Sequence, residues 1–155
     1  MNDLTLIGRQ RPLFEEDLSE KASALNDLTN GATFLIIGAA GSIGRAVAKA
    51  IFAFSPSSLH LIDISENNLV ELVRDLRSSS GDVACDLKTF AIDAGGVEFE
   101  YFLKKMGKYD YVFNLSALKH VRGERDEFTL MRMINVNILN VLRCLDYMKG
   151  AEPKK

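Results

Sequence analysis

The sequence predicts an α/β fold, in which helices cover both faces of a doubly wound parallel sheet. Three observations support this prediction. Short apolar runs alternate with helical segments four times along the chain. The runs are nearly continuous in apolar residues, which is typical of strands that are buried on both faces. A glycine-rich turn joins the first run to the helix after it, and such sheets commonly place a ligand at that junction.

The first third of the chain predicts two helices and one strand. An amphipathic helix over residues 15–28 ends near Asn30 and Gly31, which are typical of a helix C-terminus. The apolar residues 33–37 form the first strand. A helix over about 42–54 follows the glycine-rich turn and ends where Ser55-Pro56 interrupts it.

The middle of the chain repeats the pattern. A second strand covers residues 59–63, where His60 alternates with leucines and is expected to be structural. The helix over 66–77 carries leucines and valines at helical spacing and ends in a serine-rich stretch closed by Gly81. The third strand covers 87–92.

The last part predicts a helix over about 97–106, a strand over 110–115 and one long helix over about 126–149. Right-handed crossovers place the four strands in the order 3-2-1-4, with the ligand over the C-terminal edges of strands one and four. We expect a helical extension at 1–31, the binding domain at 32–150 and a short tail at 151–155.

The glycine-rich turn has the residues that a dinucleotide needs. Gly38 allows a turn whose dihedral angles a Cβ would strain. Gly41 leaves room for backbone N–H groups to approach a pyrophosphate, and Gly44 lets the helix pack closely on the strand. Asp63 closes the second apolar run 19 positions after Gly44, where a carboxylate can accept both ribose hydroxyls. The sequence therefore predicts a dinucleotide site.

Composition excludes several classes of function. The chain has 155 residues, enough for one domain with a sizeable core. Its net charge is −2, so it does not have the basic surface that nucleic acids or anionic membranes attract. It has no apolar run long enough to span a membrane. Cys85 and Cys144 do not have the spacing of a metal or redox motif and are predicted to be free thiols of a cytoplasmic protein.

These residues resemble the extended short-chain dehydrogenase superfamily, which spaces its glycines as G-x-x-G-x-x-G. More narrowly, the chain is similar to the polysaccharide-biosynthesis branch of nucleotide-sugar 4,6-dehydratases and epimerases. The similarity lies in residues 6–9, 38–44, 63–69, 116–121 and 135–136. The resemblance implies a Rossmann-type domain that binds NAD, or else NADP. It also implies a nucleotide sugar, such as a UDP-sugar, as the partner of the complete enzyme. Assembly of the chain into a homo-oligomer is a further expectation.

The resemblance also assigns site residues. Lys119 and His120 would face the sugar nucleotide, although two solvated loop residues are an equally good interpretation. Asn135 would brace the turn after strand four. The residues expected to contact the cofactor are Gly38, Ala40, Gly41, Ser42, Ile43, Gly44, Asp63, Ser65, Asp93, Ala94, Leu115, Ser116 and Ala117.

The chain departs from the family pattern at several positions. Ile37, Asn114 and Arg122 stand where threonine, histidine and proline are usual in the family. The chain is expected to end before the fifth strand. The catalytic Tyr-x-x-x-Lys and the substrate domain follow that strand in the family, so we expect this chain to lack them. The match from Tyr101 to Lys105 is interpreted as a surface helix. We therefore predict no catalytic residue and no metal ligand.

Two questions stay open at this point. The chain is either the cofactor-binding part of a nucleotide-sugar dehydratase or epimerase, or a dinucleotide-binding or assembly module without turnover. Asp63 favours NAD because a carboxylate repels a 2′-phosphate, whereas Arg45, just after the third glycine, could neutralise that phosphate.

Overall fold

The structure is a computed structural model that describes residues 8, 10–11, 14–80, 83–119 and 126–149. Its strands are β1 (Thr33–Ile37), β2 (Ser58–Asp63), β3 (Asp86–Ala91) and β4 (Tyr111–Asn114). Its helices are α2 (Glu15–Thr29), α3 (Ser42–Phe52), α4 (Glu66–Ser80), α5 (Val97–Met106), α6 (Glu127–Ile134) and α7 (Asn140–Met148), with the π-helical segment η2 (Asn135–Leu139) between the last two.

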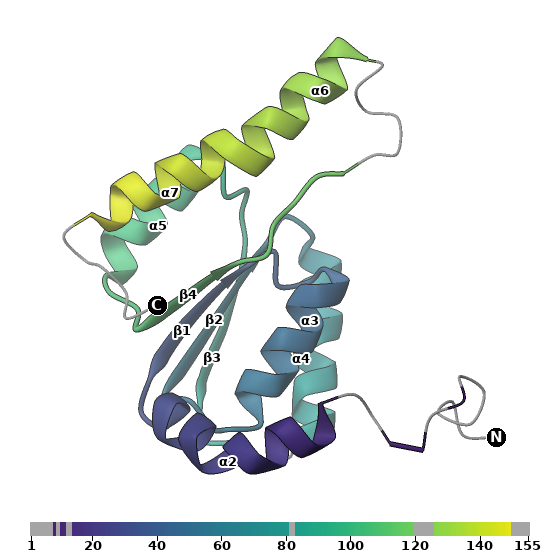
Figure 1. The fold of residues 1–155 in the computed structure, drawn as a ribbon. Coiled ribbons are helices and arrows are strands. Elements are labelled where there is room, and N and C mark those ends of the chain that lie inside the picture. The colour runs from purple at the N-terminus through teal and green to yellow at the C-terminus, as the bar shows by residue number, and fades with distance from the viewer. Residues whose placement is uncertain (1–7, 9, 12–13, 81–82, 120–125, 150–155) are drawn as a thin grey trace.

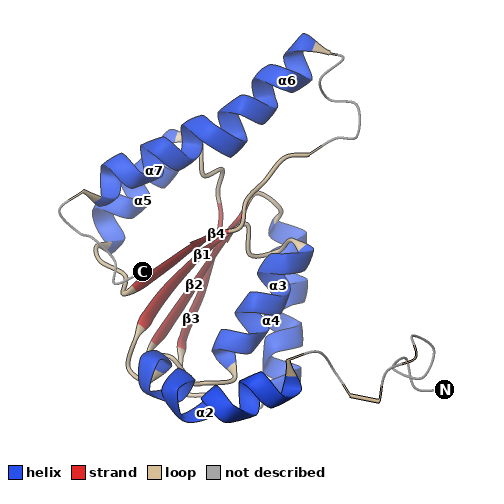
Figure 2. Cartoon of the chain, viewed as in Figure 1, coloured by secondary structure: helices blue, strands red, loops and turns tan. Residues whose placement is uncertain are grey.

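The strands form one parallel sheet in the order β3-β2-β1-β4, which confirms the predicted topology (Figures 1 and 2). Ile37, the last residue of β1, pairs with Ile62 of β2 on one side and with Asn114 of β4 on the other. The C-terminal ends of these three strands therefore lie level at one edge of the sheet. The loops that leave this edge are brought together.

Helices cover both faces of the sheet. Figure 1 shows α3 and α4 on one face, and α5 with the long helix α6–α7 on the other. Alternate residues of β1 point to opposite faces, so Phe34 and Ile36 pack with the α3–α4 layer, whereas Leu35 and Ile37 pack with the α5–α7 layer. The core thus has two halves separated by the sheet.

Burial of the strands differs from the prediction at the edges of the sheet. β1 and β2 are buried along almost their whole length. By contrast, β3 and β4 are partly exposed, and Phe113 of β4 is 37% exposed. Each of these two strands pairs with a single neighbour among the described residues. The expectation that all four strands are buried on both faces was therefore wrong for the two outer ones.

The long C-terminal helix contains a feature that the sequence did not predict. Asp126 caps its start by accepting hydrogen bonds from the backbone N–H groups of Phe128 and Thr129. The helix then runs from α6 to α7, but η2 interrupts the α-helical pattern in the middle. A π-helical turn adds a residue, and this shifts every later side chain around the helix axis. The residues that face the sheet after η2 therefore differ from those that an ideal helix would present.

His60 is structural, as predicted. It is 5% exposed in the middle of β2, and a hydrogen bond of 2.7 Å joins its Nδ1 to Tyr109 Oη. Its Nε2 lies 3.6 Å from Asp86 Oδ2 and has no hydrogen-bond partner among the described residues. Burial lowers the pKa of His60 below its usual value of 6.5, although the Asp86 carboxylate opposes this effect and the Lys88 ammonium adds to it. The folded chain therefore favours neutral His60.

This burial predicts that stability depends on pH. Below about pH 6.5 the unfolded chain binds a proton that the folded chain binds less readily. The free energy of unfolding should therefore fall as the pH drops from about 7 to about 5. Urea denaturation of wild type and of His60→Gln should show a flatter pH dependence in the variant. His120→Gln removes the other histidine and serves as the comparison. An unchanged pH dependence in His60→Gln would contradict the prediction.

Candidate functional site

A cavity of about 210 Å³ lies where the C-terminal ends of the strands meet. The glycine turn after β1 and the segments after β2, β3 and β4 form its walls together with the long helix. Eight of the residues that the sequence predicted line it, namely Gly38, Gly41, Asp63, Asp93, Ala94, Leu115, Ser116 and Ala117. The structure therefore brings together residues from four separate segments of the chain.

Two glycines of the turn stand where no side chain fits. Gly38 has a φ of +77°, and a Cβ at this position would lie 2.6 Å from the backbone nitrogen of Ser116. A Cβ on Gly44 would overlap the carbonyl oxygen of Gly38. The two glycines therefore let the turn pack directly against the backbone after β4 and against α3.

Gly41 is different because the space around it is open. The nearest atom to a Cβ there is the Gly38 carbonyl oxygen at 3.4 Å, an ordinary contact. Gly41 caps α3 without any side-chain hydrogen bond, and the helix begins with Arg45 N donating to Gly41 O at 2.8 Å. Gly41 N donates to Gly38 O at 3.3 Å, so the N–H groups left for a ligand are those just after it, at Ser42 and Ile43, and the helix dipole favours an anion there.

The carboxylate of Asp63 is held firmly at the cavity. Its Oδ2 accepts a hydrogen bond from Ala40 N at 3.0 Å, and its Oδ1 accepts one from Ser65 N at 3.0 Å. These bonds tie the end of β2 to the glycine turn. Because each carboxylate oxygen can accept more than one hydrogen bond, Asp63 can still accept from a ligand hydroxyl.

The long helix supplies a wall that sequence reasoning missed. Arg132, Val136 and Asn140 line the cavity. Arg132 Nη2 lies 3.3 Å from Asp93 Oδ2, and Asp93 Oδ1 accepts from Gly95 N at 2.8 Å. These three residues come from α6, η2 and the start of α7, so the π-helical segment helps to decide that they line the same wall. The spacing of four alone was not a sufficient signal, because the pattern of an ideal helix does not hold across η2.

The segment after β4 is fixed by two asparagines. Asn114 Oδ1 accepts hydrogen bonds from Ser116 N at 3.2 Å and from Ser116 Oγ at 2.6 Å. Asn137 Oδ1 accepts from Leu118 N at 2.9 Å, and Asn137 Nδ2 donates to Leu118 O at 2.8 Å. Asn137 is thus the brace that was expected of Asn135. Asn135 and Asn137 both lie in η2, and the expectation for Asn135 came from the family resemblance rather than from a helical period.

The other predicted site residues that the structure describes do not line the cavity. Ser65 Oγ accepts from Asn68 N at 3.4 Å and so caps α4, and Lys119 is exposed. His120 lies outside the described residues. Tyr101 is 67% exposed on α5 and does not line the cavity, in agreement with the surface-helix interpretation. The described residues that were predicted for the site and are not part of the cavity wall are Ala40, Ser42, Ile43, Gly44, Ser65 and Lys119.

Comparison with protein families decides where the chain belongs. The family described as polysaccharide biosynthesis protein matches residues 34–154, which include the cavity and all of the sheet except Thr33. The chain belongs to this family. The match begins in β1 and leaves out the N-terminal helix α2.

Two curated relatives are longer proteins. The chain is 28% identical over 124 residues to an uncharacterized membrane protein of Methanocaldococcus jannaschii, covering 79% of this chain and 34% of that protein. It is 28% identical over 120 residues to the probable polysaccharide biosynthesis protein EpsC of Bacillus subtilis, covering 74% of this chain and 20% of that protein. The chain thus spans about a third and a fifth of these relatives. No helix of the described residues is long and apolar enough to cross a membrane.

Solved structures share the fold. Pen from Bacillus thuringiensis superposes with a TM-score of 0.67 at 21% identity, covering 81% of this chain and 36% of that one. A protein of Escherichia coli CFT073, described as a short chain dehydrogenase and complexed with NADPH, gives a TM-score of 0.68 at 17% identity, covering 81% of this chain and 55% of that one. The fold is therefore the Rossmann-like fold of short-chain dehydrogenases.

The contacts of the glycines predict different costs of substitution. Gly38→Ala should lower the free energy of unfolding by more than about 1 kcal/mol, because the backbone has a positive φ and the new methyl meets the Ser116 backbone. Gly41→Ala should change it by less than about 1 kcal/mol, because its Cβ meets open space. Urea denaturation of both variants beside wild type measures the difference. Equal stability of the two variants would contradict the geometry.

Proposed function

We propose that the chain binds NAD in this cavity, as the cofactor-binding part of an enzyme that acts on nucleotide sugars. One observation carries the proposal: the open start of α3 at Gly41 and the fixed carboxylate of Asp63 line the same cavity. The first suits a pyrophosphate and the second suits a ribose, and a dinucleotide contains both groups.

The proposed ligand would lie along the edge of the sheet. Its pyrophosphate would accept hydrogen bonds from the backbone at Gly41, Ser42 and Ile43. The adenosine ribose would donate to Asp63, near Ser65. Adenine would lie beside Asp93 and Ala94. The nicotinamide half would run past the segment after β4, formed by Leu115, Ser116 and Ala117, where Lys119 and His120 would lead toward the sugar nucleotide.

The charges favour NAD over NADP. A 2′-phosphate would be placed against the Asp63 carboxylate, which repels it. Arg45, the cation that could have neutralised the phosphate, is already engaged. Its Nε donates to Ala40 O at 3.0 Å, and its Nη2 donates to Asn68 O at 3.1 Å. Binding a phosphate would require Arg45 to leave these partners.

In the proposed enzyme, NAD would take a hydride from the sugar and later return it. Among the described residues, the cavity wall contains no tyrosine, lysine or histidine that could act as the base. This observation favours a second candidate, a dinucleotide-binding module without turnover. Under both candidates this chain supplies cofactor binding. We propose 32–150 as the binding domain, with 1–31 as a helical extension and 151–155 as a tail.

Two further expectations belong to the proposal. Both cysteines are free, and free thiols fit the reducing cytoplasm in which we expect the protein to act. The homo-oligomer implied by the resemblance also stays a prediction, which sedimentation of the purified chain would test.

Calorimetric titration of the folded chain tests the proposal. NAD⁺ should bind, and NADP⁺ should bind about tenfold more weakly or worse, a difference of about 1.4 kcal/mol. Asp63→Asn keeps an acceptor but removes the charge, so it should narrow this preference. Gly41→Val fills the open space against the pyrophosphate, so it should weaken NAD⁺ about tenfold or more while circular dichroism stays unchanged. A folded chain that binds neither dinucleotide at millimolar concentration would refute the proposal.

A second titration separates the two candidates. UDP-sugars added to the complete, NAD-loaded protein that contains this chain should bind measurably if the chain is part of a sugar-nucleotide enzyme. NAD⁺ binding without any UDP-sugar binding would support the module without turnover.

A further inference from the structure

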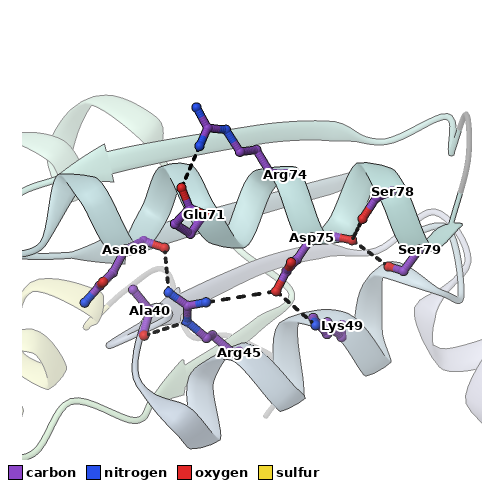
Figure 3. Close-up of polar contacts among 9 residues, drawn as sticks. All are labelled: Ala40, Arg45, Lys49, Asn68, Glu71, Arg74, Asp75, Ser78 and Ser79. Atoms are coloured by element: carbon purple, nitrogen blue, oxygen red, sulfur yellow. Dashed lines mark hydrogen bonds and ion pairs between the residues drawn. The ribbon is translucent and has the colours of Figure 1, made fainter.

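We propose that Arg45 is a positioning residue for the pyrophosphate-binding turn, acting through the backbone of Ala40 and without touching the ligand. This inference rests on the proposed binding of a dinucleotide. Figure 3 shows Arg45 reaching from α3 toward the turn at Ala40 and toward α4 at Asn68 and Asp75.

The guanidinium of Arg45 faces three acceptors at once. Nε donates to Ala40 O at 3.0 Å, Nη2 donates to Asn68 O at 3.1 Å, and Nη1 lies 4.0 Å from Asp75 Oδ2. The Arg45 side chain is 29% exposed, so these contacts are partly shielded from water. A planar fork of donors can satisfy acceptors in several fixed directions, which a lysine ammonium on a flexible stem cannot do equally well.

Ala40 is held from both sides by charged side chains. Its N–H donates to Asp63 Oδ2, and its carbonyl accepts from Arg45 Nε, each at 3.0 Å. Because the peptide bond is planar, fixing the Ala40 carbonyl also fixes the direction of the next N–H, that of Gly41. Gly41 N itself donates to Gly38 O at 3.3 Å, and the open N–H groups of α3 follow directly after it, at Ser42 and Ile43. The direction in which the turn presents its donors is therefore set partly by Arg45.

The contacts of Arg45 close a ring of hydrogen bonds around the site. Arg45 bonds the carbonyl of Asn68, and Asn68 N donates to Ser65 Oγ at 3.4 Å. Ser65 N donates to Asp63 Oδ1, and Asp63 Oδ2 accepts from Ala40 N, which returns the ring to the residue that Arg45 holds. The proposed ribose acceptor and the proposed pyrophosphate turn thus belong to one connected unit. Loss of Arg45 opens this unit on the side of the turn.

The anchor of the ring is the packing of α3 on α4. Asp75 of α4 lies 3.2 Å from Lys49 Nζ, one turn after Arg45 on α3. The same carboxylate therefore faces two cations of α3. Arg74 of α4 offers a matched control. It contacts Glu71 of its own helix at 2.6 Å and is 71% exposed (Figure 3).

The test compares Arg45→Gln with Arg74→Gln, because both changes remove one positive charge near the same two helices. ADP and adenosine are the probes, since they share adenine and ribose but only ADP has a pyrophosphate. We expect Arg45→Gln to weaken ADP about tenfold or more, and adenosine by less than about twofold. Arg74→Gln should leave both unchanged. Calorimetry measures ADP, and NMR shift titration to millimolar concentration measures adenosine.

Arg45→Lys shows whether the positive charge of residue 45 or the geometry of its hydrogen bonds matters for ADP binding. This variant also provides the test if Arg45→Gln fails to fold. It keeps the charge but not the fork, so it should weaken ADP about as much as Arg45→Gln. ADP binding like wild type in Arg45→Lys would overturn the proposal, as would equal losses for ADP and adenosine in Arg45→Gln. Failure of wild type to bind ADP or NAD⁺ would instead overturn the proposed function, and this inference with it.

Discussion

The close approach of three backbone segments at Gly38 is the constraint on which the site depends. A Cβ on Gly38 would meet the Ser116 backbone at 2.6 Å, and a Cβ on Gly44 would meet the Gly38 carbonyl. β1, the segment after β4 and the start of α3 therefore meet without a side chain between them. This contact brings the open N-terminus of α3 to the same edge of the sheet as the ends of β2 and β4, and the cavity lies at that edge.

Charge then decides what this cavity can bind. Asp63 and Arg45 both form hydrogen bonds with Ala40. The Asp63 carboxylate accepts from the Ala40 N–H, and the Arg45 guanidinium donates to the Ala40 carbonyl, so both side chains hold the turn. Asp63 also faces the cavity, whereas Arg45 is directed to α4 and the turn. The wall thus has a carboxylate where a ribose would lie, and the nearby guanidinium has other partners. In the proposed complex, the turn would favour a pyrophosphate while the Asp63 carboxylate would disfavour a 2′-phosphate.

Local sequence was enough for the centre of the sheet but not for its surroundings. β1 occupies residues 33–37 as predicted, because a short apolar run between a glycine-rich turn and a helix end has one good interpretation. The strand order followed from right-handed crossovers together with the dinucleotide-binding rule. That order already made β3 and β4 the outer strands, each with a single neighbour. The expectation that they are buried on both faces came from their apolar runs, and an apolar run alone does not show that a strand is an outer one.

The site was predicted where a residue acts through its own backbone or charge, and missed where packing of distant elements decides. Gly38, Gly41 and Asp63 follow from a motif. Arg132 reaches the cavity only because the long helix crosses the sheet edge. Asn137, rather than Asn135, bonds the segment after β4, a contact that the family resemblance did not indicate. From the sequence, Arg45 was a candidate to neutralise a 2′-phosphate. Its hydrogen bond to Asn68 depends on the packing of α3 on α4, which the sequence did not show.

The most direct measurement of the central claim is an NMR titration of the ¹⁵N-labelled chain with NAD⁺, followed amide by amide. We predict that the largest shifts fall on Gly41, Ser42 and Ile43 at the start of α3, accompanied by shifts at Asp63 and Ser65. The described chain has a second cavity lined by Leu103, Gly107 and Tyr109, near the start of β4. Shifts confined to those residues, with the amides at the start of α3 unmoved, would contradict the account.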